Sequence, residues 1–490
     1  MQLSHNTKAH KCNEKLASMM NVQAHLARFQ AAHLRNANIR SRRPSSLPFA
    51  VRRRHLEKLI TMHSAATPTA AAAAAAIIGG TEKATDRFHV MDFHHVEFWC
   101  ADAATAAARF SFGLGVRLAA QSDLSTGNTA HASRLLRSRS GSLAFLFTAP
   151  YAAADAAATA SVRSFNADAA RRFTDTHGGL AVRAVAVRVA DAAEAFFASV
   201  DAGARPAFAP ADLGRGFGFA EVELSGDTVL RFVSYPDGTD VSFLPGFQDV
   251  ASSGSCPDLG LTRFDHVVVN IPELAPVAAN VGGFTGFHRF WEFTADEVCT
   301  AESGINGVVL ANDSETVLLT LVEPVLGTRL PSHVETFLEH HGGPGVQHLA
   351  ISSDDVLGTL REIRARSAMG GFELLPPPPA SYYDSARRRV GDLLPEAQMK
   401  ECQELGVMVD RGDDNGIMLQ IFTKPAGDRP TLLLEFVQRI GCMEMEHDKE
   451  YQRPGCGGFG KRNVTDLLKS IEDNNNNTLD PAASSLALAA

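Results

Sequence analysis

The sequence predicts an α+β fold of two similar halves, each containing two strand–helix–strands units. Internal similarity is the main observation behind this prediction, because short segments of the first half recur in the second. Each segment reads as a strand, and a helical pattern follows the first two pairs. The pairs are residues 93–96 and 264–267, residues 184–191 and 348–355, and residues 229–233 and 433–437. Each half therefore supplies a strand, a helix and further strands, and then the same again.

The composition agrees with two globular domains and flanking tails. The chain has 490 residues, of which 45% are hydrophobic and 21% are charged. This length is roughly three times that of a typical domain, and the apolar content excludes disorder as the main state. The apolar run at residues 70–78 is mostly alanine and shorter than the roughly 20 residues that span a bilayer. We therefore expect no membrane segment.

The first 61 residues form a basic leader. They hold twelve Lys and Arg against two Glu, whereas the whole chain has a formal net charge of −9, so the body is acidic. An Arg-rich, acid-poor leader is typical of an organellar transit peptide, and translation from Met62 is the alternative. The acidic body disfavours nucleic-acid binding. We expect a cytoplasmic protein, or a chloroplast protein if the leader is a transit peptide.

The other segment boundaries follow from composition and from the repeat. Residues 62–87 read as an Ala-rich flexible linker, and residues 473–490, with their run of asparagines, as a disordered tail. Between them we expect an N-terminal structural domain at residues 88–250 and a C-terminal catalytic domain at residues 251–472. The glycine-rich residues 455–461 lack phosphate-loop spacing and a preceding strand, so they are interpreted as a turn that leads into the final helix.

Seven cysteines without a C-x-x-C pair argue against a disulfide scaffold and against a structural zinc site. This pattern favours a reducing compartment. We expect all of them to be free thiols: Cys12, Cys100, Cys256, Cys299, Cys402, Cys442 and Cys456.

The repeat also indicates a metal site in the second half only. At equivalent positions the first half has His95, Ala184 and Arg231, and the second half has His266, His348 and Glu435. Two imidazoles and one carboxylate are the ligands of a facial triad, which leaves coordination positions open on non-haem Fe(II). Each ligand lies within an apolar strand, which gives the metal rigid anchors.

Glu435 supplies the strongest physical argument for a bound cation. Side chains alternate along a strand, so Glu435 shares a face with Leu433 and Val437. An ionised carboxylate on such an apolar face is costly unless it is paired or coordinated. Any one of the three ligands alone is better explained as a core residue, but their equivalent positions favour a site. His95, without the other two ligands, is interpreted as a hydrogen-bonded core histidine, and His94, His333, His340 and His341 as surface or loop residues.

Further segments carry a resemblance to a known family. From about residue 86 to 473 the chain resembles plant 4-hydroxyphenylpyruvate dioxygenases, two-domain members of the vicinal-oxygen-chelate superfamily. The resemblance implies two vicinal-oxygen-chelate domains, each of paired βαβββ units that form an open barrel. The segments are residues 88–99, 263–272, 300–310, 342–349, 366–372, 401–411, 419–425, 427–431 and 439–443.

The resemblance also implies an activity in tyrosine catabolism. An aryl-2-oxo acid, 4-hydroxyphenylpyruvate, would react with O₂ at one Fe(II) per subunit to give homogentisate and CO₂, without separate 2-oxoglutarate. His266, His348 and Glu435 match the metal ligands of the family, and residues 455–470 match its C-terminal lid helix. Four residues fall on its pocket positions, namely Gln347, Gln420, Phe422 and Asn463. Relatives are dimers or tetramers, and we expect a homodimer; neither nucleic acid nor a membrane is expected as a partner.

Departures from the family pattern concentrate in the pocket. They remove hydrogen-bonding groups and three aromatic rings, which weakens discrimination and orientation of the substrate. The pair Thr320 and Val322 resembles that of 4-hydroxymandelate synthases, so a diverged paralogue that makes 4-hydroxymandelate or oxidises another aryl-2-oxo acid is the alternative. A non-catalytic binding module is disfavoured because all three ligands are present. The departing positions are Gly307, Thr320, Val322, His333, Leu433, Val464 and Leu468.

Overall fold

The computed structural model describes residues 85–151, 160–239, 243–251, 257–300, 302–446 and 449–465. These residues belong to one compact unit, Ile77–Ala490. The predicted leader, most of the linker, Leu468 and the tail lie outside the described residues. Residues 88–250 and 251–472 belong to this same unit, so the boundary between them stays a prediction.

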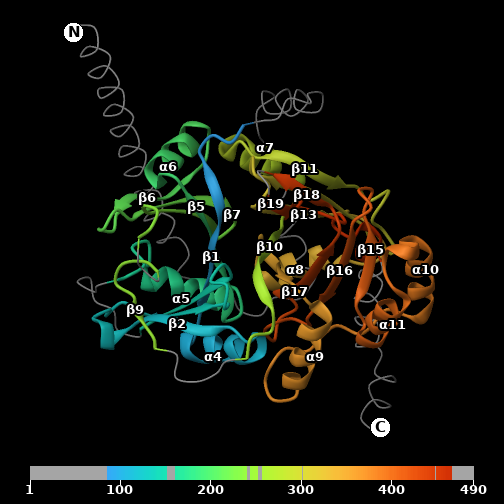
Figure 1. Cartoon of the computed structure of the whole chain (residues 1–490). Coiled ribbons are helices and arrows are strands. Elements are labelled where there is room, and N and C mark those ends of the chain that lie inside the picture. Colours follow the sequence, from blue (N-terminus) through green and yellow to red (C-terminus); the bar gives the residue numbers. More distant parts are fainter. Residues whose placement is uncertain are drawn as a thin grey trace. The chain divides into compact units, whose positions relative to one another are not determined.

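The first sheet holds nine strands in the order β6-β7-β8-β5-β1-β4-β3-β2-β9. β1 pairs in parallel with β4 and antiparallel with β5, so two strand–helix–strands units meet along β1 and β5. Figure 1 colours this half from blue to green. Its strands are β1 (Val90–Cys100), β2 (Arg117–Ser122), β3 (His131–Arg137), β4 (Ala144–Pro150), β5 (Leu180–Val189), β6 (Pro206–Asp212), β7 (Gly218–Ser225), β8 (Thr228–Ser234) and β9 (Gln248–Asp249).

The second sheet holds eight strands in the order β11-β12-β13-β10-β14-β17-β16-β15. Its central pair, β10 and β14, is antiparallel like β1 and β5, and each member has a parallel outer neighbour. The strands are β10 (Leu261–Asn270), β11 (His288–Phe293), β12 (Ile305–Ala311), β13 (Leu318–Pro324), β14 (Gly345–Ser353), β15 (Met408–Arg411), β16 (Ile417–Phe422) and β17 (Leu433–Ile440). A separate hairpin follows, β18 (Met443–Glu446) and β19 (Lys449–Gln452).

The helices complete four βαβββ units (Figure 1). α4 (Ala103–Leu114), α6 (Ala192–Asp201), α7 (Leu274–Thr285) and α9 (Val356–Ser367) each follow the first strand of a unit. α5 (Ala167–Thr176) and α8 (His333–His341) join the units of each half, and α10 (Ala380–Val390) and α11 (Glu396–Leu405) extend the last unit. Short 3₁₀ turns are η2 (Leu124–Thr126) and η3 (Gly391–Leu393). The predicted α+β class and the paired units are confirmed.

Local signals at the helix ends repeat between the halves. α4 and α7 end at Gly115 and Gly286, which take left-handed φ values of 64° and 82° that favour glycine. α6 and α9 begin after Asp191 and Asp355, whose side chains accept hydrogen bonds from the first-turn amides. The recurrence detected in the sequence therefore includes the residues that end α4 and α7 and those that begin α6 and α9.

A buried ion cluster occupies the first sheet where the second has its candidate ligands. Arg231 Nε donates to Glu221 Oε1 over 2.7 Å, and its NH2 group donates to Glu97 Oε2. Its NH1 group lies 2.9 Å from His95 Nε2. All four side chains are buried. His95 is therefore a hydrogen-bonded core histidine as predicted, and the guanidinium is the cation of this half.

One cysteine prediction is wrong. Cys442 and Cys456 form a disulfide, while Cys100, Cys299 and Cys402 are free and Cys12 and Cys256 lie outside the described residues. The hairpin β18–β19 reverses the chain between the two cysteines, so residues 14 apart in sequence meet. Sequence spacing alone could not reveal this contact.

Replacing both Cys442 and Cys456 by serine should lower the free energy of unfolding by about 2–3 kcal/mol, because a short closed loop is lost. Chemical denaturation measures this change, with the exposed free thiol Cys299→Ser as the control. An unreduced digest in which residues 442 and 456 are both alkylated contradicts the pairing.

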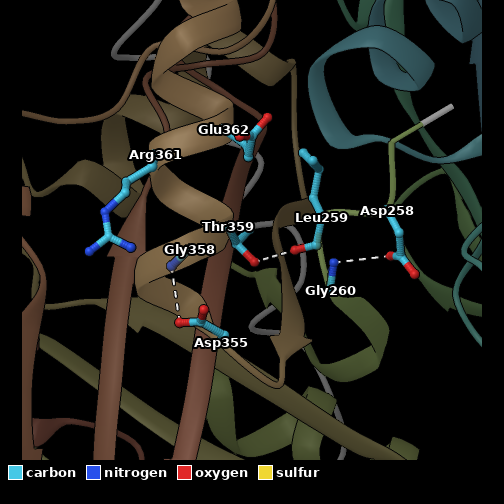
Figure 2. Close-up of a pocket in the computed structure, with 8 residues that line it drawn as sticks. All are labelled: Asp258, Leu259, Gly260, Asp355, Gly358, Thr359, Arg361 and Glu362. Carbon is cyan, nitrogen blue, oxygen red and sulfur yellow. Dashed lines mark hydrogen bonds between the residues drawn. The ribbon is translucent and has the colours of Figure 1, made fainter.

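A cavity of about 420 Å³ lies at the start of α9, apart from the candidate ligands. Figure 2 shows its lining, where Thr359 Oγ1 donates to the Leu259 carbonyl and Gly358 donates to Asp355. Asp355 thereby caps α9, whereas Arg361 and Glu362 form ion pairs with Glu401 and Arg366. Within the part of the chain that the structure describes, no helix is long and apolar enough to span a membrane.

Candidate metal centre

Three adjacent strands of the second sheet bring the predicted ligands together. In the pairing register His266 on β10 lies opposite Ala350 on β14, and Ala350 lies opposite Glu435 on β17. His348 lies two residues before Ala350 and so projects from the same face of β14. In the first sheet the same register joins His95, Ala186 and Arg231. The strand pairing thus reproduces the frame inferred from the repeat.

The three ligand groups face one another at close range. His266 Nε2 and His348 Nε2 each lie 3.3 Å from Glu435 Oε2. One ligand atom from each residue lies within 4.8 Å of the other two. The side chains of His266 and Glu435 are 5% and 1% exposed, and that of His348 is 14% exposed. Glu435 Oε2 is buried without a hydrogen-bond partner, as expected of an atom that binds a cation.

Each imidazole is oriented through its other nitrogen. His266 Nδ1 lies 2.8 Å from Asp265 Oδ1, and His348 Nδ1 lies 2.5 Å from Gln347 Oε1. Both partners accept, so both Nδ1 atoms carry the proton in the neutral ring and both Nε2 lone pairs face Glu435. This arrangement is typical of metal-binding histidines.

The charges at this site favour a cation. Burial alone would raise the pKa of Glu435, but its contacts with His266 and His348 outweigh burial and lower the pKa to about 2. Burial opposes protonation of His266, yet Asp265 and Glu435 raise its pKa to about 9. Burial lowers the pKa of His348. A metal that binds His266 Nε2 must therefore displace a proton.

Glu435 is held by a chain of amide and hydroxyl groups. Gln420 Nε2 donates to Glu435 Oε1 over 3.1 Å, and Asn463 Nδ2 donates to Gln420 Oε1 over 3.1 Å. Tyr382 donates in turn to Asn463 Oδ1 over 2.7 Å. Gln420 and Asn463, which the resemblance assigned to the pocket, thus form a hydrogen-bonded chain that ends at Glu435. Tyr382 is a further member of this chain that the sequence did not indicate.

Substituting Gln420 by Ala should weaken metal binding about 10- to 100-fold, because Glu435 loses the donor that orients it. Titration with Co(II) under anaerobic conditions measures the affinity. Gln438→Ala is the matched control, since Gln438 lies on β17 but bonds Asp354 and Val356 instead. Equal Co(II) affinity of the two variants contradicts the role assigned to Gln420.

Aromatic rings flank both histidines. The Phe422 ring meets the His348 ring edge-on with centroids 5.4 Å apart. Phe459, a residue that sequence reasoning did not select, meets the His266 ring at 5.4 Å and the Trp291 ring at 5.1 Å. Phe459 belongs to the turn at residues 454–460, called here the C-terminal turn, which precedes a helical segment at residues 461–465. The turn into a helix predicted there is confirmed.

Sequence reasoning also missed Asp265 and Arg439. Arg439 donates to both carboxylate oxygens of Asp265, over 2.7 and 2.8 Å. Burial would raise the pKa of Asp265, but Arg439 and His266 hold it well below its usual range. The available signal was positional, because Asp265 directly precedes one candidate ligand as Gln347 precedes the other.

Three of the pocket departures, Gly307, Val322 and Val464, lie at one apolar cluster. Val322 belongs to it with Phe293 and Phe337, and Val464 packs against it. Gly307 leaves the space that the Phe293 ring fills, since a Cβ there would lie 2.3 Å from that ring. Leu433 is buried opposite His348.

Two departing residues keep buried polar atoms without hydrogen-bond partners, namely Thr320 Oγ1 and His333 Nδ1. His333 is the first residue of α8, and burial together with the nearby His348 lowers its pKa to about 4. Leu468 lies outside the described residues.

Three of the remaining histidine predictions need correction. His333, predicted at a surface or in a loop, is half-buried in the first turn of α8. His94 lies within β1 and is half-buried, with Nδ1 2.6 Å from that of His95. His341 is buried at the end of α8 and stacks on His177, because the two halves meet there. His340 is exposed as predicted.

A second group of possible metal ligands consists of Asp414, Cys442 and Cys456. Both of its sulfur atoms are in the disulfide, so it offers only one carboxylate.

Comparisons with known proteins give close relatives. No protein-family model matches the chain. The chain is 70% identical to a 4-hydroxyphenylpyruvate dioxygenase of Hordeum vulgare over 390 residues, and 54% identical to one of Arabidopsis thaliana over 399 residues. Both matches cover 79% of this chain and 89% of the relative.

A solved structure supports the fold. A mutant of 4-hydroxymandelate synthase from Streptomyces coelicolor matches with a TM-score of 0.63 and 24% identity, over 79% of this chain and 99% of the other. At this identity the likeness shows the fold alone.

Proposed function

The chain belongs to the 4-hydroxyphenylpyruvate dioxygenase family, and from this premise we propose that it converts 4-hydroxyphenylpyruvate and O₂ into homogentisate and CO₂. The observation that carries the proposal is the buried group of His266, His348 and Glu435. Both oxygen atoms of O₂ are retained, one in the new ring hydroxyl and one in the shortened acid. This stoichiometry needs no second 2-oxo acid.

One Fe(II) per subunit is the proposed cofactor. The donor set fits it, because two neutral imidazole nitrogens and one carboxylate are the ligands of non-haem Fe(II) oxygenases. The buried Glu435 Oε2 without a partner and the outward bonds of both Nδ1 atoms support the same assignment. Bound Fe(II) supplies a Lewis acid for the 2-oxo acid and activates O₂.

The surrounding residues hold the reacting groups in place. Gln420 and Asn463 orient Glu435, and Asp265 and Gln347 orient the two histidines. Phe422, which pairs with Glu435 across β16 and β17, offers a ring against which an aryl group can stack. The apolar cluster around Val322 and Phe293 excludes water from the aryl end of the pocket.

A second candidate product is 4-hydroxymandelate, formed from the same substrates by attack on the benzylic carbon. Thr320 and Val322 support this candidate, because they depart from the dioxygenase pattern in the pocket. A shift of about an ångström at the reacting carbon can change which carbon is attacked. Thr320 Oγ1 offers a hydrogen bond that an apolar residue would not. Other aryl-2-oxo acids belong to the same proposal.

Product analysis tests the proposal directly. Fe(II)-loaded protein is given 4-hydroxyphenylpyruvate and O₂, and products are separated against homogentisate and 4-hydroxymandelate standards, since these isomers have equal mass. Homogentisate is the expected product. Formation of 4-hydroxymandelate supports the second candidate. If iron is bound and neither product forms, both candidates are contradicted.

The assembly and the compartment complete the proposal. We expect a homodimer, which size-exclusion chromatography with light scattering tests. A cytoplasmic location is the first expectation, and import of the full chain into isolated chloroplasts tests the alternative that residues 1–61 act as a transit peptide.

A further inference from the structure

Arg439 connects a candidate metal ligand to the C-terminal turn. It lies four residues after Glu435 on β17 and projects from the same face. Its side chain is 4% exposed and forms a bidentate ion pair with Asp265, which bonds His266 Nδ1. Such a pair has defined geometry because the guanidinium is planar and rigid.

The other donors of Arg439 hold the C-terminal turn. Its NH1 group donates to the carbonyl of Cys456 over 2.6 Å and to that of Gly458 over 2.7 Å. Its guanidinium also lies 5.3 Å from the centre of the Phe459 ring, which in turn contacts His266. One buried side chain therefore fixes both the orientation of His266 and the path of residues 456–459.

The C-terminal turn also packs closely against β16. Gly457 has a φ of 79°, and a Cβ there would lie 2.6 Å from the backbone of Ile417 on β16. The disulfide and the Gly457 amide, which donates to Asp414, attach the same turn. Beyond it, Asn463 reaches Glu435 through Gln420.

We propose that Arg439 is a positioning residue that couples metal binding at His266 to docking of the C-terminal turn. Metal binding requires His266 Nε2 to face Glu435, and Asp265 holds this orientation only while Arg439 holds Asp265. The same guanidinium orders the turn, so a bound metal and a docked turn stabilise each other. This coupling is reciprocal by thermodynamic necessity. The inference rests on the proposed metal site but not on the identity of substrate or product.

The test uses the full chain and Co(II) as a redox-stable probe. Co(II) affinity is measured from its visible absorption, and hydrogen exchange of residues 454–465 is compared with and without Co(II). In the wild type, Co(II) should increase protection of these amides. Arg439→Gln should weaken Co(II) affinity about 10- to 100-fold and remove the increase in protection.

Two further variants separate coupling from general stability. Arg439→Lys keeps a charge beside Asp265, but its three donors cannot make all four bonds of the guanidinium to Asp265 and to the two carbonyls. It should therefore retain more of the Co(II) affinity than of the protection. Arg453→Gln is the matched control, because Arg453 attaches the same segment through Asp414 and does not reach Asp265. Its Co(II) affinity should equal that of the wild type.

Unchanged protection of the wild-type turn on Co(II) binding overturns the inference, and so does wild-type Co(II) affinity in Arg439→Gln. If Arg439→Gln does not fold, the wild-type exchange data and Arg439→Lys still decide the question. A wild type that shows the coupling but forms no product contradicts the proposed function alone. Product formation without coupling contradicts this inference alone.

Discussion

His348→Ala should lower metal affinity by at least about 100-fold and abolish turnover, because one of the three metal ligands is lost. Loss of a ligand should weaken metal binding more than loss of a residue that only orients a ligand. The site is buried and closely spaced, so water replaces the imidazole poorly. Iron content after anaerobic loading and product formation measure the two effects.

The control for this prediction is the equivalent histidine of the first half. His95 bonds Arg231 and lies in the same register position of its sheet as His266 does in the second. His95→Ala should therefore keep its iron per folded molecule, although it loses a buried hydrogen bond. Full iron binding and turnover in His348→Ala, or loss of iron in folded His95→Ala, contradicts the assignment of the site to the second half.

Arg231→Met should lower the free energy of unfolding by about 3–5 kcal/mol, because Glu97 and Glu221 remain buried without their cation. Both carboxylates are at most 1% exposed. Chemical denaturation measures the loss, and iron content per folded molecule should not change.

Two variants make this result specific. Arg329→Met removes an exposed ion pair with Glu302 and should leave the unfolding midpoint unchanged. Adding Glu97→Leu and Glu221→Leu to Arg231→Met should recover much of the stability, because the uncompensated charges are then gone. A single Arg231→Met variant as stable as the wild type contradicts the role of the cluster.

The sequence predicted what depends on periodic position. The strand segments, the helix that follows each, and the candidate ligands His266, His348 and Glu435 all repeat at equivalent positions, and the pairing register shows the same equivalence. The apolar context of Glu435 was visible because strand alternation fixes which residues share a face.

Contacts between distant segments could not be predicted in this way. Arg439 reaches Asp265 across 174 residues, and His177 meets the end of α8 from the other half of the chain. The disulfide depends on the reversal of the chain in the β18–β19 hairpin. His341 is buried by His177, which lies far away in the sequence. Residue type and spacing do not encode these partners.

The equivalence of Arg231 and Glu435 has a consequence for how the halves depend on their surroundings. The first half carries the positive charge at this position covalently, on the guanidinium of Arg231 between Glu97 and Glu221, so this charge does not depend on a bound ion. In the second half the guanidinium of Arg439 is paired with Asp265, so the positive charge that directly contacts Glu435 comes from solution, as a proton on His266 or as a metal ion. The two halves thus share one fold, but at this position only the second half has a charge that depends on the concentrations of metal ions and protons.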